Sequence, residues 1–155
     1  MIPVQRLNHA VLYVRDAARA ATFYQDAFGF EVVTEMPGAA FLRASGSSNH
    51  HDLGLFSVGP DAPGPEQGRV GLYHLAWQVP AVEDLATARD TLLRFGAYSG
   101  ESDHGATKSI YGKDPDGNEF EIMWLVPRDE WGEHESSAVV APLDLAREVA
   151  RFGSR

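Results

Sequence analysis

The sequence predicts an α+β fold built from two tandem βαβββ modules. Three observations predict it. An apolar segment that contains one histidine, followed by a helical pattern and three short strand patterns, occurs twice in the 155 residues. The two histidines, His9 and His74, lie at matching positions 65 residues apart. A stretch rich in proline and glycine, GPDAPGPEQG, separates the two copies and is typical of a linker.

The first module is expected over residues 1–58. Its opening strand is predicted in LNHAVLYV, which is apolar on both faces. Asp16 has the character of a helix N-cap, Ala17–Phe28 carries apolar residues at helical spacing, and Gly29 is a stop signal. Three strand candidates follow, separated by Pro-Gly and Gly-Ser-Ser turns: FEVVTEM, AAFLRAS and HHDLGLFSV.

After a linker at residues 59–69, the second module is expected over residues 70–127. It opens with the strand candidate GLYHLAWQV and continues with a helix near Val82–Phe95. The later strand candidates are AYSGES, TKSIYG and EFEIMWLV, with an Asp-Pro-Asp-Gly turn before the last. Residues 128–155 form a polar tail with a short amphipathic helix in APLDLAREVARF. We expect the parts to form one structural domain.

Composition excludes several classes of function. The chain has no cysteine, so disulfides, thiolate nucleophiles and Cys-type zinc sites are absent. The net charge is −9, with 13 basic and 22 acidic side chains and no basic cluster, which argues against a nucleic-acid partner. The chain shows no signal-peptide pattern and no apolar stretch long enough to span a bilayer. We therefore expect a cytoplasmic protein that does not associate with membranes.

Some of the predicted apolar strands contain polar side chains of the types that bind metals. His9 and His74 stand inside the opening strands, and the last strand carries Glu119 and Glu121 on one face. An unpaired buried carboxylate is costly, and coordination to a metal removes that cost. Two imidazoles and one carboxylate with open positions are the ligand set of non-haem iron oxygenases and of some other divalent-metal enzymes. The sequence therefore predicts a metal site.

The chain resembles the vicinal oxygen chelate superfamily over about residues 5–126. The resemblance is carried by LNHAVLYVRD, FYQDAFGFEV, GLYHLAWQV and YGKDPDGNEFEIMW. It implies that the two modules form a curved, barrel-like mixed sheet around a metal site, with the helices outside. A histidine in the first strand of each module and a glutamate in the last strand bind the metal in that family. By position these match His9, His74 and Glu121, which selects Glu121 over Glu119.

Within the superfamily, the chain most resembles the extradiol ring-cleaving dioxygenases. His51, in NHHDLGLF, matches the acid/base histidine of those enzymes, while His104 and Tyr111 fall in a segment similar to their signature. The resemblance implies an oxidoreductase of aromatic degradation that cleaves a catechol-like ortho-dihydroxy aromatic with O2. Fe(II) is the expected cofactor, with Mn(II), Zn(II) or Ni(II) as other possibilities.

Two other functions of the superfamily stay open. The first is a glyoxalase-type lyase or isomerase, although the glutamate that such enzymes place late in the first module is replaced here by His50, His51 and Asp52. The second is a metal-free drug-binding resistance protein. Fosfomycin-type transfer is disfavoured because no basic cluster would bind a phosphonate. A homodimer is expected from the habit of the family.

Overall fold

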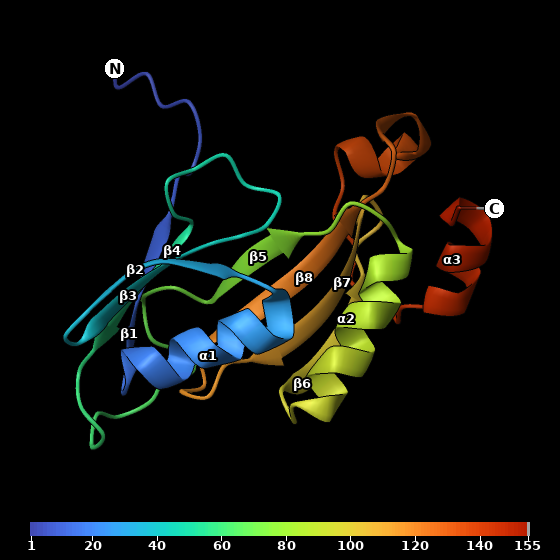
Figure 1. The fold of residues 1–155 in the computed structure, drawn as a ribbon. Coiled ribbons are helices and arrows are strands. Elements are labelled where there is room, and N and C mark those ends of the chain that lie inside the picture. Colours follow the sequence, from blue (N-terminus) through green and yellow to red (C-terminus); the bar gives the residue numbers. More distant parts are fainter. Residues whose placement is uncertain (155) are drawn as a thin grey trace. The chain divides into compact units, whose positions relative to one another are not determined.

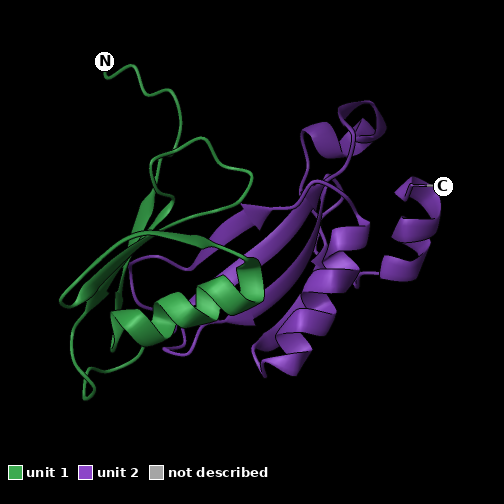
Figure 2. Ribbon diagram, in the orientation of Figure 1, with its two compact units in different colours: residues 1–65 green, residues 66–155 purple. Residues whose placement is uncertain are grey.

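A computed structural model describes residues 1–154 of the chain. The chain divides into two compact units, Met1–Pro65 (unit 1) and Glu66–Arg155 (unit 2), which Figure 2 colours separately. Unit 1 contains four strands and one helix: β1 (Ala10–Val14), α1 (Ala17–Phe28), β2 (Glu31–Met36), β3 (Ala39–Arg43) and β4 (Leu53–Ser57). Its strand order is β1-β4-β3-β2, with β1 parallel to β4 and the other pairs antiparallel.

Unit 2 repeats this arrangement. Its elements are β5 (His74–Gln78), α2 (Glu83–Arg94), β6 (Tyr98–Asp103), β7 (Thr107–Lys113) and β8 (Glu119–Leu125). The order β5-β8-β7-β6 again has a parallel first pair followed by two antiparallel pairs. Two 3-10 turns (Arg128–Glu130 and Gly132–Glu135) and α3 (Leu145–Phe152) follow, and α3 lies beside α2 (Figure 1). The predicted α+β fold with two βαβββ modules is confirmed.

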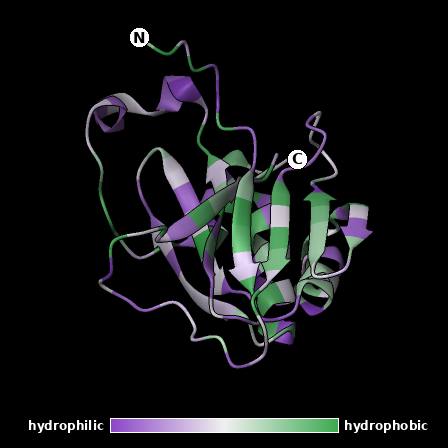
Figure 3. Ribbon diagram, turned by 90° about the vertical axis from the view of Figure 1, so that its left-hand side faces the viewer, coloured by the Kyte–Doolittle hydropathy of each residue, from purple (hydrophilic) through white to green (hydrophobic). Residues whose placement is uncertain are grey.

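Helix α1 forms where the sequence predicts it, with the predicted signals at both ends. The Asp16 carboxylate accepts hydrogen bonds from the backbone amides of Ala18 and Arg19, and Gly29 ends the helix with a positive φ of 68°. Its apolar face, which includes the fully buried Tyr24, packs on β3 and β4. Unit 1 therefore has a core between one helix and one face of its sheet. Figure 3 shows hydrophobic colour on many strand segments and more hydrophilic colour on the loops.

The turn before β8 is built around a buried carboxylate. Asp114 accepts hydrogen bonds from the backbone amides of Asp116 and Asn118, and Gly117 adopts a φ of 90°. These contacts fix where β8 begins. The predicted Asp-Pro-Asp-Gly turn thus sets the register of the strand that carries Glu121.

The opening strands are shorter than predicted, and the sheets are separate. LNHAVLYV was expected to be one strand, but β1 begins at Ala10 and His9 lies just before it; GLYHLAWQV contains β5, in which His74 is the first residue. The reason is the partner strand, because β4 begins only at Leu53 and residues 44–52 form a loop. Within residues 1–154 the strands form two open four-stranded sheets and no closed barrel. None of the described helices is long and apolar enough to cross a membrane.

Candidate functional site

A cavity of about 750 Å³ in unit 2 brings together four of the residues singled out in the sequence: His74, His104, Tyr111 and Glu121. Strands β5, β8 and β7 are adjacent, and the register pairs Tyr111 with Glu121. His104 lies in the loop between β6 and β7. Residues from four separate segments thus converge because the sheet order places their strands side by side.

Glu121 is the buried acid of this cavity, with 9% of its surface exposed. One carboxylate oxygen, Oε1, accepts a short hydrogen bond from the hydroxyl of Ser109, a fully buried residue of β7. The other oxygen, Oε2, lies 3.0 Å from Nε2 of His74. Ser109 therefore fixes the carboxylate so that a single oxygen faces the imidazole.

The His74–Glu121 pair fits a divalent metal ion. Imidazole nitrogen and carboxylate oxygen bind such ions at about 2.0–2.2 Å, so two ligand atoms at a right angle lie roughly 3.0 Å apart. The separation of Nε2 and Oε2 is 3.0 Å. Both ligand types suit iron, manganese, zinc or nickel. These two side chains could therefore hold one ion with further positions open to other ligands.

Tyr111 and His104 form a hydrogen-bonded pair on the wall of the same cavity. The Tyr111 hydroxyl lies 2.7 Å from Nε2 of His104. Burial raises the pKa of Tyr111, and the negative charge of Glu121 raises it further. The phenol therefore stays protonated near neutral pH and acts through hydrogen bonds.

Unit 1 holds a separate cluster of imidazoles. The rings of His9 and His51 lie 4.5 Å apart between centroids, and His51 also packs edge-on against Phe41 at 5.1 Å. Nδ1 of His50 lies 3.1 Å from Nδ1 of His51. His9 is exposed and His51 is half-buried. The structure thus places the predicted ligand His9 directly beside the predicted acid/base His51.

A buried aspartate shapes the loop that carries these histidines. Asp52 accepts hydrogen bonds from the backbone amide of Ala44, the hydroxyl of Ser47 and the amide of Asn49, at 2.7–2.9 Å. Asn49 also donates to the backbone carbonyl of Asn8 at 2.8 Å. Burial by itself raises the pKa of Asp52, but these hydrogen bonds outweigh it and the pKa is lowered. The loop is therefore tied to the segment that holds His9.

His51 has the electrostatic surroundings of a base. Its removal from water lowers its pKa, and the nearby imidazoles of His9 and His50 lower it further, while Asp52 acts in the opposite direction. A lowered pKa keeps the imidazole neutral near pH 7, the form that accepts a proton.

Each unit supplies part of the predicted site. Within residues 1–154, neither unit by itself gathers three His, Asp or Glu side chains that could hold a metal ion. The role of Ser109 was missed, although it lies two residues before Tyr111 and thus on the same strand face. The structure adds His134, which lies in the 3-10 turn Gly132–Glu135. It is half-buried against Gly105, and its Nδ1 is buried with no hydrogen-bond partner in the described chain.

Dioxygenases of aromatic diols are similar to this chain in sequence. Catechol-2,3-dioxygenase of Bacillus subtilis (strain 168) is 32% identical over 126 residues, which are 81% of this chain and 43% of that protein. Biphenyl-2,3-diol 1,2-dioxygenase 3 of Rhodococcus globerulus is 36% identical over 130 residues, 79% and 65% of the two chains. A manganese-dependent 2,3-dihydroxybiphenyl 1,2-dioxygenase of Geobacillus genomosp. 3 is 29% identical over 139 residues, 86% and 41% of the two chains. The chain spans less than two thirds of the length of each.

Solved structures share the fold. A glyoxylase/bleomycin resistance protein/dioxygenase domain from Frankia sp. EAN1pec gives a TM-score of 0.65 at 19% identity, covering 79% of this chain and 99% of that one. A lactoylglutathione lyase from Agrobacterium tumefaciens gives 0.60 at 23% identity, covering 79% and 96%. The family model for the Glyoxalase/Bleomycin resistance protein/Dioxygenase superfamily matches residues 6–122. The chain therefore belongs to this superfamily.

Proposed function

We propose that this protein is a metal-dependent extradiol-type dioxygenase that cleaves a catechol-like ortho-dihydroxy aromatic with O2. The observation that carries the proposal is the cavity of unit 2, in which His74, Glu121, His104 and Tyr111 meet. The similarity to dioxygenases of catechol and of biphenyl-2,3-diol supports the same reaction class. Fold similarity alone would not, because one fold hosts many reactions.

His74 and Glu121 would hold the ion, with His9 of unit 1 as the third ligand. Fe(II) is the proposed metal and Mn(II) the second choice, in keeping with the manganese-dependent relative. When bound, the ion would supply positive charge that binds the two adjacent substrate oxygens and O2 next to one another. Ser109 would keep Glu121 Oε2 turned toward His74, because it occupies the other carboxylate oxygen.

Three side chains would transfer protons or form hydrogen bonds at the substrate. His51, which is neutral near pH 7, would take a proton from one substrate hydroxyl and later return it to the product. Tyr111, which stays protonated, would hydrogen-bond the other substrate oxygen, and His104 would hold the Tyr111 hydroxyl in place. The product would be a ring-opened semialdehyde or a related acid that contains both atoms of O2.

The rival lyase requires a carboxylate that unit 1 lacks. The register pairs Val11 with Gly54 in unit 1 and Ala76 with Glu121 in unit 2. Val11 and Ala76 each lie two residues after the histidine of their own unit, so Gly54 occupies the position that corresponds to Glu121. A glyoxalase-type site would have a second glutamate in β4, and β4 has none.

The test is anaerobic reconstitution with Fe(II) or Mn(II), followed by oxygen uptake over a panel of catechols. We expect uptake with diols, coupled to ring-fission products that absorb in the visible, and none with the mono-methyl ether of the same catechol. Glu121→Gln serves as the inactive control. Metal-loaded protein that consumes no O2 with any diol but isomerises a hemithioacetal would overturn the proposal in favour of the lyase. Failure to retain any metal would favour a drug-binding protein.

A further inference from the structure

The chain after β8 returns to the loop that carries His104. The backbone amide of Asp103 donates to the carbonyl of Ala141 at 2.8 Å, and the amide of Ala141 donates back to Asp103 at 2.9 Å. Ala141 lies beyond residues 6–122, which the family model matches, whereas Asp103 lies within them. Unit 2 thus has a segment, residues 128–152 (the C-terminal segment), that is held against the edge of its sheet.

The same segment contacts the ring of His104 directly. Nδ1 of His104 lies 2.8 Å from the backbone carbonyl oxygen of Val139, and Nε2 lies 2.7 Å from the Tyr111 hydroxyl. A carbonyl oxygen only accepts hydrogen bonds, so Nδ1 must carry a proton. In the neutral imidazole Nε2 is then the acceptor, and the hydroxyl of Tyr111 donates to it.

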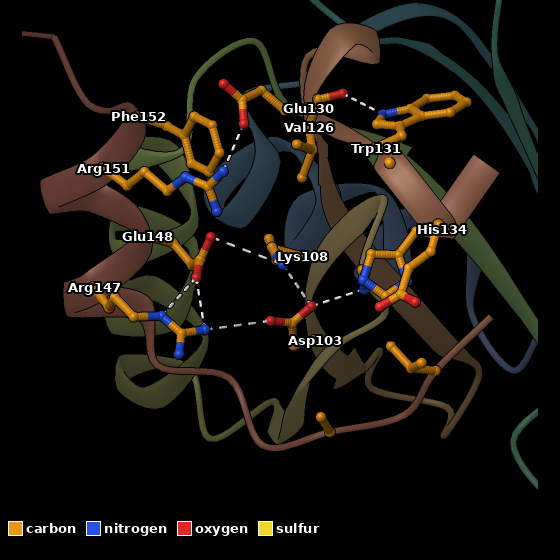
Figure 4. A pocket seen from close by; sticks show the side chains of 15 residues that line it. Asp103, Lys108, Val126, Glu130, Trp131, His134, Arg147, Glu148, Arg151 and Phe152 are labelled. Carbon is orange, nitrogen blue, oxygen red and sulfur yellow. Dashed lines mark hydrogen bonds and ion pairs between the residues drawn. The ribbon is translucent and has the colours of Figure 1, made fainter. Parts of the chain in front are cut away.

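A buried group of charges anchors the C-terminal segment (Figure 4). Lys108 of β7 lies 2.5 Å from Oδ1 of Asp103 and 3.8 Å from Oε2 of Glu148 in α3. Arg147 lies 2.9 Å from the other oxygen of Glu148 and 3.7 Å from Asp103. The side chains of Lys108 and Glu148 are 8% and 3% exposed, and that of Asp103 is 12% exposed. Because buried charges are costly when unpaired, α3 and Asp103 are held in one arrangement.

We infer that the C-terminal segment is a positioning element of the catalytic cavity, which acts by fixing the tautomer of His104. The Val139 carbonyl holds His104 with its proton on Nδ1, so that Nε2 receives the hydrogen of the Tyr111 hydroxyl. The Tyr111 oxygen then presents only lone pairs to the cavity and accepts a hydrogen bond from a ligand hydroxyl.

This assignment concerns the resting protein, and only its consequence for substrate rests on the proposed function. With the other tautomer, Nε2–H of His104 would donate to the Tyr111 oxygen, and the phenol would turn its own hydrogen toward the cavity. The site would then favour a ligand oxygen that accepts, such as a phenolate, over a hydroxyl that donates. The C-terminal segment thereby selects the protonated diol as the form that first binds beside Tyr111.

The direct test is nitrogen NMR of histidine-labelled, metal-free protein at about pH 8.5, where histidines are ordinarily neutral. We expect His104 to have its proton on Nδ1. Tyr111→Phe should leave that tautomer in place, because the carbonyl and not the phenol sets it. Ala141→Pro, which removes the amide that bonds Asp103, should release His104 to a mixture of tautomers. Ala138→Pro is the matched control, because the Ala138 amide makes no backbone hydrogen bond within residues 1–154.

The kinetic test separates this inference from the proposed function. In the metal-loaded enzyme, Ala141→Pro should lower kcat/KM for a diol by about 10–100-fold, the range for an outer partner of a ligand or catalytic group, with metal content unchanged. If Ala141→Pro unfolds the segment, Glu148→Gln, which weakens only the anchor, gives the same readouts. A proton on Nε2 of wild-type His104 overturns the inference and leaves the dioxygenase proposal standing. The expected tautomer without any oxygen uptake contradicts only the proposed function.

Discussion

Unit 1 places Gly54 and Phe41 side by side on β4 and β3, whereas unit 2 places Glu121 and Tyr111 at the same register positions of β8 and β7. The strand order and the pairing are otherwise alike. Phe41 packs against His51 with hydrocarbon, while Tyr111 offers a hydroxyl to His104. The two sheets therefore supply equivalent positions, and the side chains at two of them decide which unit presents a carboxylate.

The two units also differ at one hairpin, which is β2–β3 in unit 1 and β6–β7 in unit 2. In unit 1 the strands β2 and β3 are joined by the short turn at Pro37 and Gly38. In unit 2, β7 has 7 residues where β3 has 5, and the loop between β6 and β7 carries His104. Asp103, the last residue of β6, is also the residue with which the C-terminal segment pairs in unit 2.

The largest expected effect comes from replacing Glu121, whose counterpart in unit 1 is Gly54. Glu121→Gln should reduce affinity for Fe(II) or Mn(II) by more than about 100-fold, because an anionic ligand is lost. Glu119→Gln, on the same strand face, is the control and should bind metal as wild type does. Metal titration of both proteins checks this. A larger loss in Glu119→Gln than in Glu121→Gln would show that the family position has been assigned to the wrong glutamate.

Replacing His51, the proposed base in unit 1, should lower turnover without changing the metal content. His51→Ala is expected to lower kcat for a diol by about 10²–10⁴-fold, the usual contribution of a general base. Metal content, measured on the same samples, should stay at the wild-type value. His50→Ala tests the neighbouring imidazole and should retain most of the activity. Normal turnover by His51→Ala would refute the role given to His51.

The buried charge group of unit 2 should dominate local stability. Lys108→Met removes the buried cation between Asp103 and Glu148 and leaves only the more exposed Arg147 beside them; breaking a buried ion pair typically costs about 3–5 kcal/mol. Lys113→Met changes an exposed residue of the same strand and should alter the free energy of unfolding by less than about 0.5 kcal/mol. Urea unfolding compares the two. A loss below 1 kcal/mol for Lys108→Met would mean that the group does not anchor the segment.

Acid sensitivity should arise in part from a hydrogen-bonded aspartate in each unit. The folded state lowers the pKa of Asp52 in unit 1 and of Asp103 in unit 2. A lowered folded pKa gives stability that is present above the unfolded pKa, about 3.9, and is lost as the pH falls through the folded value. The free energy of unfolding should therefore decline below about pH 4. Asp52→Asn should be less stable at pH 7 but show a flatter decline. An unchanged slope would contradict this assignment.

Local signals predicted much of the fold. The Asp16 cap, the apolar spacing of Ala17–Phe28 and Gly29 lie within one stretch of chain, and α1 has those bounds. The Asp114 turn likewise depends on contacts within four residues. Strand starts were less predictable, because β1 begins where its partner β4 begins, which is decided more than 40 residues away.

The sequence predicted which residues form the candidate site, but not how their side chains are arranged. Sequence pattern and family resemblance selected Glu121, but not that its two oxygens are divided between Ser109 and His74. The burial of Lys108 and the hydrogen bond from His104 to Val139 depend on where the C-terminal segment packs. No local sequence pattern predicts that position. Such contacts arise from tertiary packing, which the spacing of residues along the chain does not encode.

The most direct test of the proposed metal site is whether His9 of unit 1 and the His74–Glu121 pair of unit 2 bind the same ion. Calorimetric titration of metal-free protein with Mn(II), together with the Mn(II) EPR spectrum, should give one ion per chain in wild type. We expect His9→Ala to weaken this binding by at least about 100-fold and to alter the spectrum, and His50→Ala to do neither. Mn(II) binding to His9→Ala with wild-type affinity and an unchanged spectrum would contradict the proposed site.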